Sequence, residues 1–234
     1  MTLTRIVPRL RFAGTALALI ALPLALVGCK KTTSAPVIVS GFTIVQGNNQ
    51  VAQAGVVLPT PVVLRVIDAN GDAVPNITVV FAISTGGGTV SPSSIITDAN
   101  GEVAVKWTLG QASPVQMLSA AVGDGTPVVL FSTALFPSSI LAAQGNSQTG
   151  KINQSLNNTI VIRVTGDNNV PLSGIPVQFQ VTGGGGAISP QTALTNAFGE
   201  VTAKWTLGGT VGMNSATATA STLNPVQLLA TATP

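Results

Sequence analysis

Large apolar residues alternate with small or polar residues along most of the chain after about residue 40. In Ile77–Ser84 every second residue, including Phe81, is large and apolar, and Val103–Trp107 shows a similar pattern that ends on Trp107. A period of two is typical of β-strands, because successive side chains of a strand point to opposite faces of a sheet. We therefore expect strands throughout this region, with Phe81 and Trp107 in a hydrophobic core.

Other segments show the same alternation and are separated by residues that favour turns. Asparagine and glycine tolerate the backbone angles of tight turns, so Asn70-Gly71 and Asn100-Gly101 mark strand ends. The glycine runs Gly86–Gly88 and Gly183–Gly186 lack the lysine and the helix that follow a phosphate-binding loop, and we expect flexible connections there. Further strands are predicted at Phe42–Gln46, Val62–Ile67, Leu118–Val122 and Val128–Thr133.

The chain contains two copies of one unit. A shift of 98 positions aligns Ser40–Ala134 with Ser138–Ala232 without a gap, and about a third of the positions are identical. Phe179 and Trp205 are the counterparts of Phe81 and Trp107, so we expect them in a second core.

Each copy therefore predicts one all-β domain. Roughly seven short strands in ~95 residues, separated by turns, indicate a two-sheet sandwich of immunoglobulin type. Cys29 is the single cysteine of the chain, so no intrachain disulfide can form and hydrophobic burial must hold each sandwich together. We expect tandem immunoglobulin-like domains at residues 40–136 and 137–234, after an N-terminal lipoprotein signal peptide.

The N-terminus is first basic and then apolar. Three arginines precede or open the apolar stretch Phe12–Val27, an arrangement typical of a secretory signal. The four residues that follow one another at its end resemble the lipobox of bacterial lipoproteins: Leu26, Val27, Gly28 and Cys29. The resemblance implies cleavage before Cys29, acylation of that cysteine and anchoring in a membrane. We expect a signal peptide at residues 1–28 and an acylated N-terminus with a flexible tether at residues 29–39.

Removal of residues 1–28 would also remove the basic bias of the chain. The full sequence has 10 Lys and Arg against 7 Asp and Glu, and three of the basic residues lie before Cys29. The balanced remainder gives no reason to expect a nucleic-acid partner. Lys30 follows Cys29, and by resemblance to lipoprotein sorting in Gram-negative bacteria a lysine there implies the outer membrane.

Several motifs resemble the bacterial Ig-like domains of group 1, which occur in tandem in intimin-type and invasin-type surface proteins. The first copy carries Val66-Ile67-Asp68-Ala69-Asn70-Gly71, and Thr97-Asp98-Ala99-Asn100-Gly101 followed by Trp107-Thr108-Leu109-Gly110. The second copy matches in Thr195-Asn196-Ala197-Phe198-Gly199 but has Gly166-Asp167-Asn168-Asn169 in place of Asp-Ala-Asn-Gly. The resemblance implies a β-sandwich and a cell-surface role, and it names no particular partner.

Few residues suit catalysis or metal binding. The chain has no histidine and no tyrosine, so acid–base chemistry would fall to seven carboxylates. Glu102 and Glu200 are equivalent in the two copies, as turn positions are, whereas a catalytic pair is expected once, in a cleft. Asp68, Asn70 and Asp72 have the spacing that opens a calcium loop, but no later glutamate completes it and we favour a hairpin turn. We expect no enzymatic activity, no metal and no cofactor.

Two interpretations of function follow from these features. In the first, the chain is a cell-envelope lipoprotein whose tandem domains act as a rigid spacer or as an adhesion module for a protein or glycan. In the second, it is a carbohydrate-binding or accessory lipoprotein that uses loops of the second domain. Sandwich loops cluster at the ends of the sheets, so we expect contacts at Gly166–Asn169 and Thr182–Ala187. Phe198 replaces Asn100 in its turn and is the candidate for ligand contact.

Overall fold

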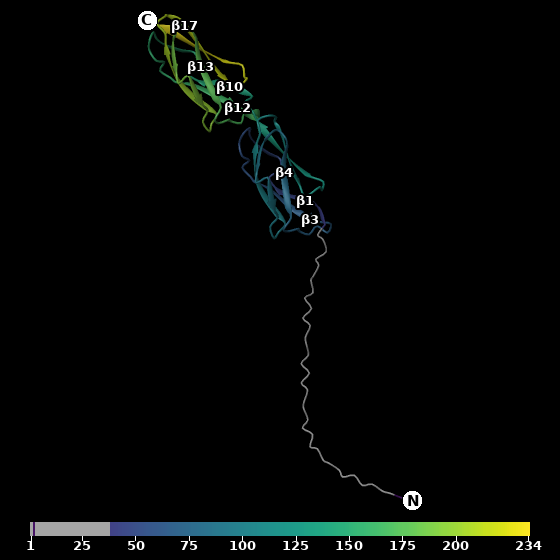
Figure 1. The fold of residues 1–234 in the computed structure, drawn as a ribbon. Helices are drawn as coiled ribbons and strands as arrows, with labels where there is room; N and C mark the ends of the chain where they lie inside the picture. The colour runs from purple at the N-terminus through teal and green to yellow at the C-terminus, as the bar shows by residue number, and fades with distance from the viewer. Residues whose placement is uncertain (1, 3–37) are drawn as a thin grey trace. The chain divides into compact units, whose positions relative to one another are not determined.

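The computed structural model describes residue 2 and residues 38–234, which form strands and one short 3-10 helix (Figure 1). The predicted lipobox, namely Leu26, Val27, Gly28 and Cys29, lies outside the described residues, as do most of the predicted signal peptide and tether. Among the described residues, no helix has the length and apolar character needed to cross a bilayer.

The first nine strands form two facing sheets. The four-stranded sheet has the order β1-β3-β7-β5, and the five-stranded sheet has the order β2-β9-β8-β4-β6. Neighbouring strands are antiparallel except β2 and β9, which are parallel. The strands are β1 (Val39–Gln46), β2 (Gln50–Gln53), β3 (Val62–Asp68), β4 (Thr78–Thr85), β5 (Gly88–Ser91), β6 (Ser94–Ile96), β7 (Glu102–Leu109), β8 (Val115–Ala121) and β9 (Val128–Leu135).

The second nine strands repeat this topology. Their sheets have the orders β10-β12-β16-β14 and β11-β18-β17-β13-β15, with β11 and β18 parallel. The elements are β10 (Ser139–Gln144), β11 (Gln148–Lys151), β12 (Ile160–Thr165), η1 (Asp167–Asn169), β13 (Pro176–Gly183), β14 (Gly186–Ser189), β15 (Thr192–Leu194), β16 (Glu200–Leu207), β17 (Gly212–Ala220) and β18 (Val226–Thr233). The predicted fold class of two tandem immunoglobulin-like sandwiches is confirmed, while the exact division at residues 136 and 137 stays a prediction.

Each sandwich has its own core between its two sheets. Trp107 and Trp205 are fully buried, and Phe81 and Phe179 are 3% exposed. These side chains occupy inward positions of β7, β16, β4 and β13, where alternate residues are buried. The alternation read from the sequence therefore corresponds to the inner and outer faces of the sheets.

The sequence pattern missed short strands, so that it predicted about seven per copy where the structure has nine. In the first copy, β2, β5 and β6 have only three or four residues, and a period of two does not stand out over so short a segment. The glycine runs connect β4 to β5 and β13 to β14, as expected, although their last residues already belong to the next strand, and the flexibility of these connections stays a prediction. Gly88 and Gly186 open β5 and β14, which pair with β7 and β16. A Cβ at either glycine would collide with the backbone of the paired strand, so the strands approach closely because glycine is there.

Candidate interaction surfaces

Polar residues that the two copies share build turns. The Oδ1 atom of Asp98 accepts hydrogen bonds from the backbone N–H groups of Asn100 and Glu102, at 2.9 and 2.8 Å. Asn196 does the same for the N–H groups two and four residues later, at 2.8 and 3.1 Å. An acceptor that binds two following N–H groups fixes a tight turn. Asp98 and Asn196 therefore hold the entry to β7 and β16.

Phe198 lies in the second of these turns. Its backbone N–H is bound by Asn196, while 71% of the residue is exposed. The turn thus fixes the backbone and leaves the aromatic ring to solvent. Phe198 has no aromatic counterpart in the first copy, where the equivalent residue is the exposed Asn100.

Asp68 has a turn-forming role as well. One carboxylate oxygen accepts hydrogen bonds from the N–H groups of Asn70 and Asp72, at 2.8 and 2.9 Å. The backbone of Asp68 and Asp72 is also bonded across the same turn, at 2.9 Å. This geometry is that of a hairpin turn, in which the oxygen is directed at backbone N–H groups instead of a cation. Within residues 38–234, no three acidic, histidine or cysteine side chains are grouped as a metal site would require.

The two equivalent glutamates each face an arginine on the neighbouring strand. Arg65 Nη2 lies 2.8 Å from Glu102 Oε1, and Arg163 forms the same ion pair with Glu200. Both pairs lie directly across the ladder on the outer face of a four-stranded sheet. An exposed pair of this kind contributes about 0–1 kcal/mol. The geometry is that of cross-strand support on an open face, not of a catalytic cleft.

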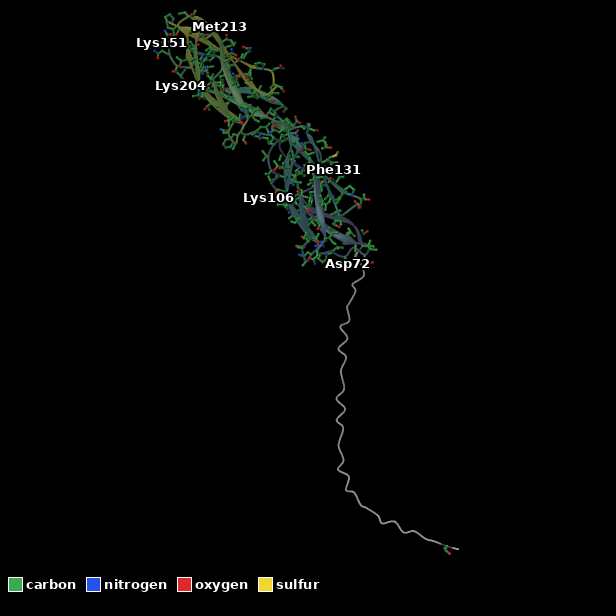
Figure 2. The ribbon with its side chains drawn as sticks, in the orientation of Figure 1. Asp72, Lys106, Phe131, Lys151, Lys204 and Met213 are labelled. Atoms are coloured by element: carbon green, nitrogen blue, oxygen red, sulfur yellow. The ribbon has the colours of Figure 1, made fainter. Side chains whose placement is uncertain are left out.

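Each four-stranded sheet also carries a lysine on its outer face. Lys106 and Lys204 are exposed on β7 and β16, at positions that alternate with the buried tryptophans. Figure 2 shows Lys106 on one side of the first sandwich and Phe131, from the five-stranded sheet, on the other. In the first sandwich, the strands of the four-stranded sheet therefore carry charged side chains and those of the five-stranded sheet carry none, whereas in the second sandwich Lys151 lies on β11 of the five-stranded sheet.

A buried amide in each copy was not predicted from the sequence. Gln116 and Asn214 are fully buried at inward positions of β8 and β17. The Oε1 atom of Gln116 accepts a hydrogen bond from the N–H of Gly110 at 2.9 Å, and Asn214 Oδ1 accepts from Gly208 at 3.2 Å. In the sequence, each is a polar residue at a position that the alternation places on the same inward face as Leu118 or Ala216. Both amides bind the glycine that ends the Trp-Thr-Leu-Gly motif, and Gln116 Nε2 also donates to the carbonyl of Gly86 in the loop after β4, at 3.5 Å.

The five-stranded sheet of the first sandwich has an uncharged outer face, on which large apolar side chains lie among small polar residues such as Thr78, Ser94 and Thr133. None of its strands contains a charged residue. Large apolar side chains are 37–60% exposed on this sheet. We call these six residues the apolar face: Val51, Val80, Ile96, Val115, Val129 and Phe131.

The matching face of the second sandwich is mixed in character. The six equivalent positions hold three polar residues, Thr149, Gln178 and Gln227, and three apolar residues, Leu194, Met213 and Leu229. Two further outward positions change in the same direction, since Ala82 and Met117 of the first copy correspond to Gln180 and Ser215. The fold therefore accepts either polar or apolar residues on this face.

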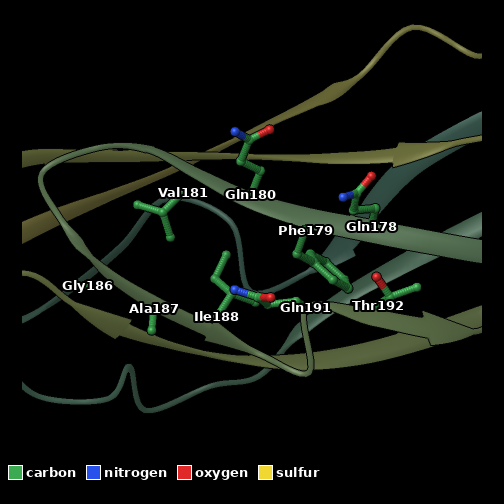
Figure 3. Close-up of a pocket in the computed structure, with 9 residues that line it drawn as sticks. All are labelled: Gln178, Phe179, Gln180, Val181, Gly186, Ala187, Ile188, Gln191 and Thr192. Carbon is green, nitrogen blue, oxygen red and sulfur yellow. The ribbon is translucent and has the colours of Figure 1, made fainter.

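A cleft of about 390 Å³ opens beside this mixed face, between β13, β14 and the start of β15. Figure 3 shows Gln178 and Gln180 pointing away from the ribbon of β13, with Phe179 directed to its opposite side. Gln191 and Thr192 complete the polar part of the lining. The cleft offers neutral hydrogen-bonding groups and no charge.

The two loops of the second sandwich that are expected to make contacts lie at its opposite ends. Gly166–Asn169 follows β12 and belongs to the connection that leads to Pro176, the first residue of β13. In this connection the N–H of Gly174 donates to the carbonyl of Thr195. Thr182–Ala187 begins near the end of β13, six residues beyond Pro176. Six residues of a strand cover about 20 Å. The loops therefore lie at different ends of the sandwich, and contact by either of them stays a prediction.

Comparison with known families identifies part of the chain. Residues 44–130 match the family model described as bacterial Ig-like domain (group 1). No curated protein matches the chain.

Solved structures with related folds come from bacterial surface proteins. They include the Yersinia pseudotuberculosis adhesin InvE (19% identity, TM-score 0.43), invasin, titled a bacterial integrin-binding protein (21%, 0.43), and domains 4 and 5 of the S-layer protein SbsC (11%, 0.45). These matches cover 82%, 82% and 84% of this chain, and 59%, 40% and 99% of the respective structures.

Proposed function

We propose that this chain, whose residues 44–130 form a bacterial Ig-like domain of group 1, is a non-enzymatic protein of the bacterial cell envelope. Its two sandwiches act as a rigid spacer or as an adhesion module that presents outer faces to a protein or glycan. Catalysis and metal chemistry have no part in this role.

The proposal rests on one observation, namely that the polar groups shared by the two copies have structural roles. Asp98 and Asn196 hold turns, Glu102 and Glu200 pair with arginines, and the buried amides bind backbone. Each of these groups has a structural partner, and each recurs in the second copy. A duplicated framework of this kind favours a geometric role over a chemical one.

We further propose that Cys29 anchors the protein in a membrane, with Leu26, Val27 and Gly28 as the recognition sequence for cleavage. Acyl chains contribute ~0.8 kcal/mol per buried methylene, so two or three chains hold a protein on a bilayer. The outer membrane of a Gram-negative bacterium is the proposed location, since Lys30 follows the cysteine.

A second candidate function is carbohydrate binding by the second sandwich. The cleft beside β13 supports it, because three glutamine side chains at this site correspond to Val80, Ala82 and Ser93 in the first copy. Neutral amides hydrogen-bond to sugar hydroxyls without a charge requirement. Phe198 does not line this cleft.

The anchor is tested with the full chain in a Gram-negative host fed an alkyne fatty acid. We expect label on the wild-type chain and recovery in the outer membrane, with both lost in Cys29→Ser. Ser34→Ala is the matched control beyond the proposed cleavage site. Unchanged labelling and membrane recovery of Cys29→Ser would contradict the anchor.

The adhesion role is tested on cells that produce the full chain. We expect more adhesion to host-cell layers than for cells without it, and the same adhesion when Gln178 and Gln191 are changed to alanine. The carbohydrate function predicts binding on a glycan array that the double variant loses, with Phe198→Ala as a separate arm. Equal adhesion with and without the chain would contradict the adhesion form of the proposal.

A further inference from the structure

We propose that the apolar face of the first sandwich binds the same face of a second copy of this chain. The face is formed by side chains of five strands whose neighbours are fixed by hydrogen-bonded ladders. At its centre Phe131 lies directly across from Met117, and Val129 lies across from Ser119. The proposed partner is a second molecule with the same surface.

The second sandwich shows that the apolar residues are not required by the fold. It has the same strand order, yet it places Gln178 and Gln227 where the first sandwich has Val80 and Val129. Val80 is 51% exposed and Val129 is 37% exposed. Exposure of such side chains gives up the free energy that their burial would provide. Covering this face would recover part of that free energy.

The neutrality of the face suits an identical partner. A two-fold interface brings the same patch of both molecules together, so any net charge on the patch would be repelled by the identical charge of the partner. The five strands carry no charged residue, whereas the opposite sheet of the same sandwich carries Arg65, Glu102 and Lys106. A partner recognised by charge would need charges on this face. A second copy needs none.

The size of the face fits a weak dimer. Strands lie about 4.8 Å apart and rise about 3.3 Å per residue, so the sheet offers roughly 500 Å² in each copy. Two copies would then bury about 1,000 Å² in total, at the lower limit of specific interfaces. We therefore expect association that depends on local concentration.

The edges of the sheet do not compete for this partner. The edge strands β2 and β6 have four and three residues, and short edges offer few free backbone groups for strand pairing. The apolar face is a larger surface for association than these edges, because it carries the exposed apolar side chains.

The test uses the full chain in cells, produced together in two versions with different affinity tags. A photo-crosslinking amino acid replaces Phe131, and the matched control replaces Leu229, the equivalent residue of the second sandwich. We expect an adduct of twice the chain mass that carries both tags from position 131, at a yield at least about tenfold above that from position 229.

A double variant separates association from folding. Val80→Gln with Val129→Gln places on β4 and β9 the residues that β13 and β18 already carry, so the thermal unfolding midpoint should change little. Each substitution occurs twice in a two-fold interface, and we expect the adduct from position 131 to fall at least about tenfold. Val80→Thr with Val129→Thr, which keeps β-branched residues, serves if the glutamine variant unfolds. Absence of the double-tagged adduct, its persistence in the folded variant, or a crosslink from position 131 only to another protein or to lipid would overturn the proposal.

Discussion

The side-chain oxygen of Gln116 lies 2.9 Å from the backbone nitrogen of Gly110 and accepts its hydrogen bond in the interior of the first sandwich. The amide nitrogen of Gln116 donates to the carbonyl of Ser113 at 2.5 Å. The side chain thus ties the end of β7 to the start of β8. Asn214 and Gly208 repeat the relationship in the second sandwich, at 3.2 Å.

Replacement of Gln116 by methionine should destabilise the first sandwich. The change keeps the length of the side chain but leaves the N–H of Gly110 without this acceptor, which costs about 1–3 kcal/mol. Urea unfolding followed by tryptophan fluorescence measures the loss. Gln111→Met, at an exposed position of the same connection, should change the free energy of unfolding by less than about 0.5 kcal/mol. Equal effects of the two variants would show that the buried hydrogen bond contributes nothing.

Gly110 is expected to tolerate no side chain. A Cβ at this position would collide with the backbone of Gly86 and Gly87, so Gly110→Ala should lower stability by about 1–3 kcal/mol through overpacking. Gly41→Ala is the control, since no atom lies within 4 Å of a Cβ placed there. A thermal midpoint of Gly110→Ala within a degree of the Gly41→Ala value would refute the steric argument.

The contribution of Thr97 to the stability of the first sandwich should depend more on its hydroxyl than on its methyl group. The Oγ1 atom donates to the carbonyl of Val74 at 2.8 Å and accepts from the N–H of Ile77 at 2.9 Å, in a residue that is 2% exposed. Thr97→Val leaves both backbone groups unpaired and should cost about 1–3 kcal/mol. Thr97→Ser keeps the hydroxyl and should retain most of the stability. Chemical denaturation of both variants checks the order, and a serine variant less stable than the valine variant would contradict it.

The Arg65–Glu102 ion pair should contribute little to the free energy of unfolding. The two side chains are 44% and 28% exposed, so solvent screens their attraction. A double-mutant cycle with Arg65→Met and Glu102→Gln should give a coupling energy of about 0.2–1 kcal/mol, reduced at 1 M salt. A coupling above about 2 kcal/mol that is insensitive to salt would show a stronger role than this geometry allows.

The longer strands and the cores could be predicted because their signal is local. Alternation over seven or eight residues gave the inward positions of Trp107 and Phe81, and the 98-residue repeat carried them to the second copy. The three- and four-residue strands gave no such signal. Their place depends on a partner strand, as when Val51 on β2 meets Thr133 on β9 in a parallel ladder.

The candidate surfaces show the same division. Phe198 could be singled out from the sequence because it breaks the repeat within a turn motif, and its exposure follows from that turn. The cleft with Gln178 and Gln191 could not, because its residues meet only after β13 pairs with β15. The placement of the loops Gly166–Asn169 and Thr182–Ala187 at opposite ends of the second sandwich also depends on strand direction, which alternation along the sequence does not give.

The alternation and the 98-residue repeat are enough to show that this protein is two copies of one β-sandwich, with alternate positions facing a core and with turns at Asn-Gly, Asp98 and Asn196 closing the strands. Which outward residues become neighbours depends on how the strands pair in the folded chain. Val80, Val129 and Phe131 are distant in sequence or separated by an inward residue, and they form one apolar face because β4, β8 and β9 lie side by side. Alternation sets the side of a strand to which a residue points, whereas strand pairing between distant segments sets what lies beside it.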